Sequence, residues 1–497
     1  MRVEWRAVLD QLRSEINTQP AIAATAFTFS GQRRVPAWDP RSTPALVQLN
    51  AITSQVFAGI GRSPVPVLLP FDTATYLEAR TNGAPDSLSV SRHQADFRPA
   101  DLFHAGAAGY DAMFSLEPGA GDGMPSRTFA KPVEVQITGS ILTYDLADPQ
   151  GGKGEPVKAL AAQFPDMRRF IREGYVRYAF TRFGVPYVVS IQCLDSTPRP
   201  RRLACREAYP VAERFLKALR IAGGQPSRPR RDISSDLAER PVALSPDFIY
   251  RPSGDIIANS GGRKQGGHVD WTAYSQIRFP LEKAPAFVRS QSFARRAKSD
   301  QPASGYLWRD NFCEARSFNV GQCASGFGHQ GQDIRPGACP TQNDGGTPPT
   351  CDPKQQGIVA VRDGVLIRSL KQQAATLQVN TRNEHIRFRY MHMNPASMDA
   401  EGVLNGRRVA EGEKIGLVSN YLDRPNGTSL HLHFDVQVFT RDGWIWVNPY
   451  TTLISAYERL IRGRGHENGA EPAVSAAVAH ALPEEVHHPD VNEGGEN

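Results

Sequence analysis

The chain has 497 residues, of which 22% are charged and 40% are hydrophobic, and its net charge is +6. The hydrophobic share is large enough to build a core, which argues against full disorder. The 43 glycines and 38 prolines argue against a helical bundle or coiled coil, because both residue types weaken helix interiors. The length predicts two to four domains at about 150 residues each.

The first 16 residues do not resemble a secretory signal peptide, because charged residues interrupt any apolar run. Their apolar residues instead recur at the spacing of an amphipathic helix, namely at Trp5, Val8, Leu9, Leu12 and Ile16. No apolar run reaches the roughly 18 residues that a membrane-spanning helix needs. We therefore expect neither a signal peptide in the chain as given nor a transmembrane segment.

Composition divides the chain into five ranges. Residues 1–45 are predicted to be a helical lead and a loop, and residues 46–225 an α+β domain of unknown type and function. Residues 226–270 are rich in Gly, Pro and Arg and are interpreted as a linker. A second globular domain is expected at 271–460. The tail 461–497 is acidic and poor in apolar residues, which predicts disorder.

The first domain carries no recognisable catalytic constellation. Its predicted elements, in chain order, are a helix at 44–60, a buried strand at 64–72, a half-buried strand at 132–146, a hairpin at 175–193 turning near Gly184, and a helix at 210–223. His93 and His104 stand alone in this domain and are interpreted as structural or exposed residues.

Charge is unevenly distributed along the chain. The tail 461–497 contains two arginines and seven acidic residues, so the rest of the chain is more basic than the net value indicates. A basic body favours an anionic polymer such as nucleic acid, a lipid surface or a cell wall. No run of Lys and Arg with interleaved aromatic residues supports nucleic acid, so no nucleic-acid partner is expected.

The six cysteines form three local pairs with sequence separations of 12, 10 and 12 positions: Cys193 and Cys205, Cys313 and Cys323, and Cys339 and Cys351. None lies in a C-x-x-C motif, which argues against a thiolate zinc site. An even number in loop-like sequence predicts three disulfides, although six cysteines allow 15 pairings and unrelated thiols are the alternative. Disulfides imply an oxidising compartment such as a periplasm. A removed leader would reconcile this with the missing signal peptide.

Two motifs in the second domain place histidine near carboxylate. The first is His329-Gln330-Gly331-Gln332-Asp333, in which both end residues are zinc-ligand types and the glycine would let the backbone bend so that they converge. The second is the run LHLHFDV at 430–436. In a strand, its two histidines and its aspartate share one face while its apolar residues face a core. Burying two imidazoles on such a strand requires a partner, which a metal supplies.

A third motif, Tyr390-Met391-His392, closes the strand-like IRFRYMHM. H-x-G-x-D, then Y-x-H, then L-H-L-H-F, in that order, resemble the lysostaphin/LytM-type zinc metallopeptidases over residues of about 325–455. The turns at 359–365 and 409–416 and the Asn-Pro near 446–449 are also similar to that family. The resemblance implies a C-terminal antiparallel β-sandwich and a zinc endopeptidase that cuts the peptide part of peptidoglycan.

Carried over by position, the resemblance implies that His329, Asp333 and His433 bind one Zn²⁺ per chain, while His392 and His431 remain unligated. The expected reaction is amide hydrolysis. The residues leave open which of the two unligated histidines is the base. We favour His431, which lies two positions from a ligand, and we expect His392 to stabilise the oxyanion.

Two other polar residues receive weaker assignments. Asp435 either orients an imidazole or is an exposed charge just beyond the site. His385 lies outside the motifs and is expected at the surface.

The sequence departs from the family pattern around the site. An insertion at 335–356 follows the first motif, a long loop at 419–430 precedes the third, and Asp435 replaces the usual glutamate. Cys313–Cys323 and Cys339–Cys351 disulfides would then brace loops on both sides of His329.

The leading hypothesis is a zinc endopeptidase acting on peptidoglycan in the periplasm or cell envelope, for cell-wall remodelling. The first alternative is a non-catalytic LytM-type regulator that binds a wall amidase or peptidoglycan. The second is a zinc-free binding module with a structural histidine cluster. The N-terminal domain would target the enzyme to its substrate, inhibit it, or simply pack against the second domain. The sequence identifies no protein partner.

Overall fold

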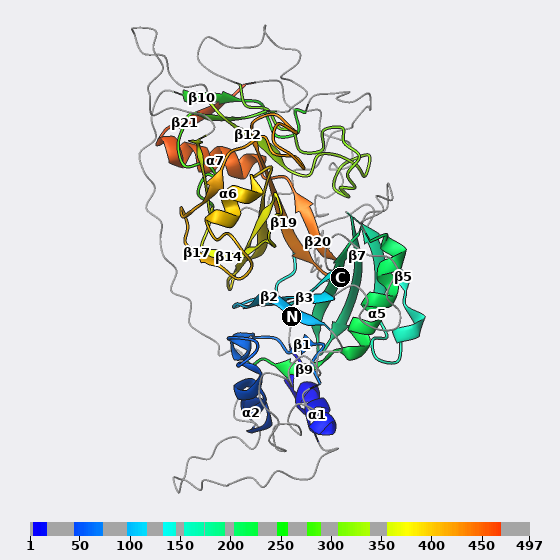
Figure 1. The fold of residues 1–497 in the computed structure, drawn as a ribbon. Helices are drawn as coiled ribbons and strands as arrows, with labels where there is room; N and C mark the ends of the chain where they lie inside the picture. Colours follow the sequence, from blue (N-terminus) through cyan, green and yellow to red (C-terminus); the bar gives the residue numbers. More distant parts are fainter. Residues whose placement is uncertain are drawn as a thin grey trace, which may run out of the picture.

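The structure is a computed structural model, and it describes residues 3–16, 44–72, 97–116, 133–145, 154–172, 174–193, 203–226, 246–256, 276–289, 307–337 and 355–468. The described part is mostly β-sheet with few helices. Two large antiparallel sheets dominate it, one from each half of the chain (Figure 1). None of the described helices is long and apolar enough to cross a membrane.

The sheet of the N-terminal half has the strand order β2-β3-β4-β8-β7-β6-β5. Its strands are β2 (Arg98–Ala105), β3 (Gly109–Leu116), β4 (Val133–Ser140), β5 (Glu155–Pro156), β6 (Arg168–Arg172), β7 (Tyr175–Arg182) and β8 (Val185–Gln192). The elements around it are α1 (Trp5–Ile16), α2 (Pro44–Thr53), α5 (Ala208–Ala218), the antiparallel pair β1 (Val67–Leu69) and β9 (Arg220–Gly223), and the 3₁₀ turns Ile60–Arg62, Lys158–Leu160 and Cys205–Glu207. One hydrophobic core joins these helices to the sheet.

Several local predictions for this half can be compared with the structure. The amphipathic helix near the N-terminus is confirmed as α1, and the hairpin is confirmed as β7–β8, with Gly184 at a φ of 71° in its turn. The helix predicted at 44–60 ends at Thr53. The helix predicted at 210–223 ends at Ala218, because the residues after it extend and pair with β1.

The sheet of the C-terminal half has the order β11-β12-β19-β16-β15-β14-β17, with β20 paired to β19, and a separate two-stranded sheet joins β13 and β18. The strands are β11 (Ala286–Val288), β12 (Gln332–Pro336), β13 (Gly357–Val359), β14 (Gly364–Ile367), β15 (Ala375–Asn380), β16 (His385–Met391), β17 (Arg408–Val409), β18 (Lys414–Leu417), β19 (Leu432–Thr440) and β20 (Gly443–Val447). The helices are α6 (Pro395–Ala400) and α7 (Tyr450–Ile461). The sandwich form that the family resemblance implies remains a prediction.

Strand β19 separates an apolar face from a polar one. Its residues Leu432, Phe434, Val436 and Val438 belong to the hydrophobic core of the C-terminal half. Because side chains alternate along a strand, the residues between them face the other side of the sheet. The predicted alternation of the LHLHFDV run is therefore confirmed.

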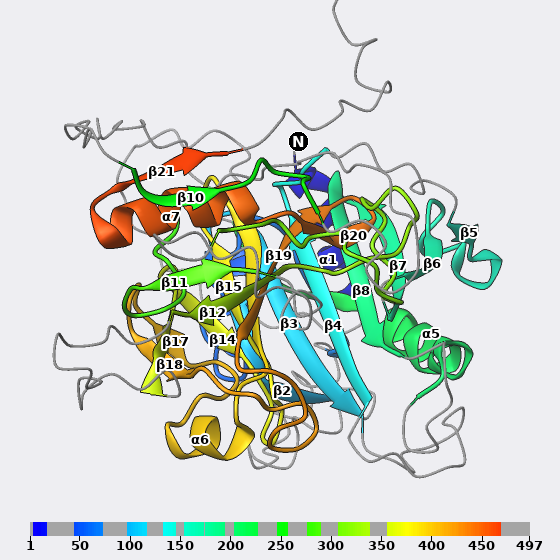
Figure 2. The same ribbon diagram turned by 90° about the horizontal axis from the view of Figure 1, so that it is seen from above.

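The two large sheets contact each other on that second side. Phe439 and Trp444 pack with Ala179 and Val188 of the N-terminal sheet, and Trp444 Nε1 donates a hydrogen bond to Thr138 Oγ1 at 3.2 Å. Figure 2 shows β19 and β20 lying across β3, β4 and β8. The N-terminal half therefore covers the far end of the same sheet face that carries His433.

A short parallel pair joins two distant parts of the chain. Strand β10 (Pro246–Tyr250), within the range interpreted as linker, pairs with β21 (Arg464–Glu467), at the start of the range interpreted as tail. Phe248 of β10 packs against Trp308 and Tyr457, with ring centroids 5.0 Å away in both cases. Apolar side chains in an otherwise polar range thus anchor this pairing.

Two of the three predicted disulfides are confirmed, Cys193–Cys205 and Cys313–Cys323. Cys339, Cys351 and His93 lie outside the described residues. The two disulfides favour an oxidising, extracytoplasmic environment.

Candidate metal centre

Strand pairing brings the three histidine motifs together. Strand β12 pairs with β19 so that Asp333 lies opposite His433, and β19 pairs with β16 so that Met391 also lies opposite His433. His329 precedes β12 and His392 follows β16. The antiparallel register therefore gathers residues from three separate segments at one end of the sheet.

Gly331 is required in the first motif for a reason other than the predicted one. A Cβ atom at this position would lie 2.3 Å from the Phe434 carbonyl oxygen and 2.7 Å from Asp435 Cβ. The chain before β12 passes directly against β19, and only glycine leaves room for it. Close approach, rather than a bend, explains the glycine.

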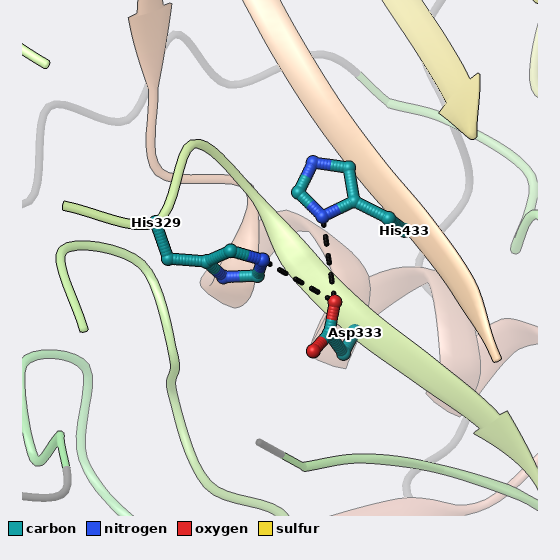
Figure 3. A group of neighbouring side chains, drawn as sticks. All are labelled: His329, Asp333 and His433. Carbon is teal, nitrogen blue, oxygen red and sulfur yellow. Dashed lines mark hydrogen bonds and ion pairs between the residues drawn. The ribbon is translucent and has the colours of Figure 1, made fainter. Parts of the chain in front are cut away.

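The three predicted ligands converge on one point (Figure 3). His329 Nε2 lies 3.3 Å from Asp333 Oδ1, and His433 Nδ1 lies 3.4 Å from the same oxygen. One ligand atom from each residue lies within 4.8 Å of the others, and all three side chains are buried. This group could hold a metal ion.

Asp333 tests whether a metal fits the site. Its Oδ2 atom is buried and has no hydrogen-bond partner among the residues that the structure describes. A buried carboxylate oxygen without a partner costs free energy, and a cation would satisfy it. Although burial alone would raise the pKa of Asp333, His329 and His431 hold it well below the usual value, so the carboxylate is charged. Two imidazoles and a carboxylate form a donor set suited to Zn²⁺.

The contacts of the outer ring nitrogens bear on the tautomers of the two candidate imidazole ligands. His329 Nδ1 lies 2.9 Å from the Asn311 carbonyl oxygen, which can only accept, so this nitrogen carries the proton. His433 Nε2 lies 3.3 Å from Asp435 Oδ2, a close contact between oppositely polar groups that does not have hydrogen-bond geometry. With the proton on Nε2 of His433, as it is on Nδ1 of His329, the nitrogens that face Asp333 would present lone pairs to a metal ion.

His392 and His431 lie beside this group, with their ring centroids 4.7 Å apart. Their Nδ1 atoms face the carbonyl oxygens of Tyr421, at 3.2 Å, and Ser429, at 2.7 Å. His431 Nε2 lies 3.4 Å from Asp333 Oδ1. Because a carbonyl oxygen can only accept a hydrogen bond, Nδ1 of each neutral ring carries the proton and Nε2 is unprotonated.

Burial, together with His431 and His433, lowers the pKa of His392 to about 3. Burial also lowers the pKa of His431 to about 4, although Asp333 opposes this shift. Both imidazoles are thus neutral at pH 7 and able to accept a proton. His392 also has a positive φ of 65°, a left-handed conformation that is uncommon outside glycine.

The structure separates the two interpretations of Asp435 and corrects that of His385. Asp435 is fully buried and contacts His433, so an exposed charge is wrong. His385 is also fully buried, and its Nε2 lies 2.7 Å from Asp111 Oδ2 in the N-terminal sheet. The predicted surface position was wrong because the N-terminal half covers it. His104 of β2, which lies opposite Asp111 in the pairing of β2 with β3, is buried as well.

The Cys313–Cys323 disulfide lies directly against His329. Cys313 N donates a hydrogen bond to the His329 carbonyl oxygen at 2.9 Å, and a Cβ at Gly328 would lie 2.8 Å from Cys323 Sγ. The predicted brace on this side of His329 is therefore present. The sequence interpretation did not identify Asn311, Tyr421 and Ser429, because they act through backbone carbonyl groups, which any residue type supplies.

Comparison with known proteins adds little to this geometry. No family model matches the chain, and no curated protein matches it. A solved structure from Ruminococcus gnavus, described as a candidate glycyl-glycine endopeptidase LytM, is similar at 17% identity with a TM-score of 0.23. The match covers 39% of this chain and 65% of that chain. Because a TM-score this low does not establish a common fold, the functional inference rests on the site itself.

Proposed function

We propose that this protein is a zinc-dependent endopeptidase that hydrolyses peptide bonds in peptidoglycan stem peptides or cross-links, for cell-wall remodelling. The observation that carries the proposal is the convergence of His329, Asp333 and His433, with a buried Asp333 oxygen that lacks a hydrogen-bond partner among the described residues. The motifs that supply these residues occur in the order typical of lysostaphin/LytM-type peptidases.

His329 Nε2, Asp333 and His433 Nδ1 would hold one Zn²⁺. When bound, Zn²⁺ supplies a Lewis acid that activates water and polarises a carbonyl group. Three protein ligands leave the fourth tetrahedral position for water or substrate, as catalytic sites require.

His431 and His392 would move protons. We assign His431 as the general base, because its Nε2 is unprotonated and lies 3.4 Å from the ligand Asp333. His392, with its ring 4.7 Å from that of His431, would receive from His431 the proton taken from water. The resulting imidazolium would stabilise the oxyanion and then return this proton to the leaving amine. The carbonyl groups of Ser429 and Tyr421 hold the two rings in these tautomers.

The substrate and location belong to the same proposal. Two disulfides are consistent with a periplasmic or envelope protein, and a basic body suits an anionic wall. A non-catalytic regulator that binds a wall amidase or peptidoglycan would use the same surface without hydrolysis.

Digestion of isolated peptidoglycan tests the proposal. The full-length protein should contain about one zinc per chain and release muropeptides identifiable by mass spectrometry. His431→Ala should retain zinc and release nothing, whereas the matched control His466→Ala, at an exposed position in β21, should behave as wild type. Zinc without release from several wall types would favour the regulator. Absence of zinc from the wild type would contradict the metal centre itself.

A further inference from the structure

Asp435 is a buried carboxylate held by donors from two neighbouring strands. Its Oδ2 accepts a hydrogen bond from Arg389 Nε at 2.7 Å and lies 3.3 Å from His433 Nε2. Its Oδ1 accepts a hydrogen bond from Trp446 Nε1 at 3.1 Å. Because β16 and β20 supply these donors from either side of β19, the carboxylate is fixed in one orientation behind His433.

Arg389 connects this carboxylate to the other imidazole ligand. It lies opposite Asp435 in the β16–β19 register, and its Nη2 donates a hydrogen bond to Gln330 Oε1 at 3.0 Å. Gln330 follows His329 directly in the chain. The planar guanidinium holds its N–H groups at fixed relative directions, so it links the strand carrying His433 to the segment carrying His329.

Arg387 provides a matched comparison on the same face of the same strand. Like Arg389 it pairs with a buried aspartate, in this case Asp111 at 3.3 Å. It also donates a hydrogen bond to Gln378 Oε1 at 2.6 Å, and its guanidinium carbon lies 3.9 Å from the Trp444 ring centroid. These partners join the two sheets and include none of the candidate ligands.

We propose that the Arg389–Asp435 pair is the positioning unit of the metal centre, which holds the His433 ring with Nδ1 directed at Asp333 and sets its spacing from His329. This inference rests on the proposed function, since it presupposes that these three residues bind Zn²⁺. A carboxylate behind a histidine ligand fixes its tautomer and raises its basicity. Arg389 acts through Asp435 and Gln330, so both members of the pair are positioning residues.

Metal binding by full-length Arg389→Gln and Arg387→Gln variants tests the inference without relying on activity. The Zn²⁺ dissociation constant would be measured by chelator competition and the ligand geometry by the visible absorption spectrum of the Co²⁺ form. We expect Arg389→Gln to weaken Zn²⁺ binding by about ten- to a hundredfold and to change the Co²⁺ spectrum. Arg387→Gln should change neither.

A second pair of variants covers the case in which Arg389→Gln does not fold. Asp435→Asn keeps the shape of the side chain and removes its charge, so it should weaken Zn²⁺ binding to a similar extent. Asp435→Glu keeps the carboxylate and should recover most of the affinity. Equal affinities for Asp435→Asn and Asp435→Glu would overturn the inference.

The inference would also be overturned if Arg389→Gln bound Zn²⁺ as wild type does, or if Arg387→Gln weakened binding equally, since the effect would then come from the sheet in general. In both cases the wild type still binds zinc and the proposed function stands. A wild type that binds no Zn²⁺ overturns the proposed function and this inference together.

Discussion

Two buried aspartates, Asp111 of the N-terminal sheet and Asp333 of the C-terminal sheet, contact histidine in very different ways. In the joint between the two sheets, Asp111 accepts a hydrogen bond from Thr138 Oγ1 at 2.7 Å, contacts His385 Nε2 at 2.7 Å and pairs with Arg387 at 3.3 Å. Its two oxygens are thus satisfied by a hydroxyl group, an imidazole and a cation.

Asp333, in strand β12, has three imidazole nitrogens at 3.3 to 3.4 Å from Oδ1 and no hydrogen-bond partner for Oδ2 among the described residues. Both oxygens of Asp111 thus have partners within the protein. In Asp333, three imidazoles lie near Oδ1 at longer distances, and Oδ2 has no hydrogen-bond partner among the described residues. Residue type alone does not distinguish a structural histidine from a ligand. The number and length of the carboxylate's contacts do.

The largest expected effect comes from removing the carboxylate of Asp333. Asp333→Ala removes one of three protein ligands, so the zinc content should fall from about one per chain to none detectable by elemental analysis. The fold should persist, because the side chain makes few close hydrogen bonds. Retention of stoichiometric zinc would show that the distinction between the two clusters is false.

Removal of the Asp111 carboxylate should instead lower the stability of the fold and leave zinc binding unchanged. Asp111→Ala leaves Arg387 and His385 buried without their partner, so the free energy of unfolding should fall by about 3–5 kcal/mol. The zinc affinity of the folded fraction should not change, because the joint lies away from the ligands. Denaturant titration and chelator competition on the same sample measure both quantities, and a large loss of zinc affinity would contradict the separation.

The two disulfides can be compared in the same way, because one lies beside His329 and the other lies in the N-terminal half. Cys313→Ala/Cys323→Ala and Cys193→Ala/Cys205→Ala each open a bridge of similar sequence separation, 10 and 12 residues. Both should lower the free energy of unfolding by about 2–4 kcal/mol. The first should also weaken Zn²⁺ binding about tenfold, because Cys313 holds the backbone of His329. Equal zinc affinities for the two variants would show that the brace does not reach the site.

The smallest effect concerns the pH dependence near the joint. Burial lowers the pKa of His104 from 6.5 to about 4, although Asp111 opposes this shift. Between these values the unfolded chain binds a proton that the folded chain does not, so stability falls as the pH drops from about 6.5 towards 4. The contribution is at most about 3 kcal/mol. Unfolding titrations of His104→Gln should show a shallower decline than wild type, and those of exposed His466→Gln should show the same decline.

The sequence predicted which candidate residues lie together better than it predicted what surrounds them. The alternation in 430–436 and the order of the motifs are local properties, so they predicted that His433 and Asp435 share a face. The partner of Asp435 could not be predicted, because Arg389 lies on another strand and only the β16–β19 register places them together. The burial of His385 depends on the N-terminal sheet, whose docking no local pattern indicates. The local pattern predicts helix over residues 220–223, which form β9. Their pairing with β1 could not be predicted, because β1 is distant in sequence.

The left-handed backbone at His392 has a consequence for engineering the protein. A side chain in this conformation costs about 1 kcal/mol relative to glycine, so the backbone at His392 alone would be more stable with glycine there. The same replacement deletes the imidazole beside His431. If the proposed hydrolysis is correct, the backbone strain at His392 is retained for the sake of the imidazole, which a library screened only for folding would not preserve.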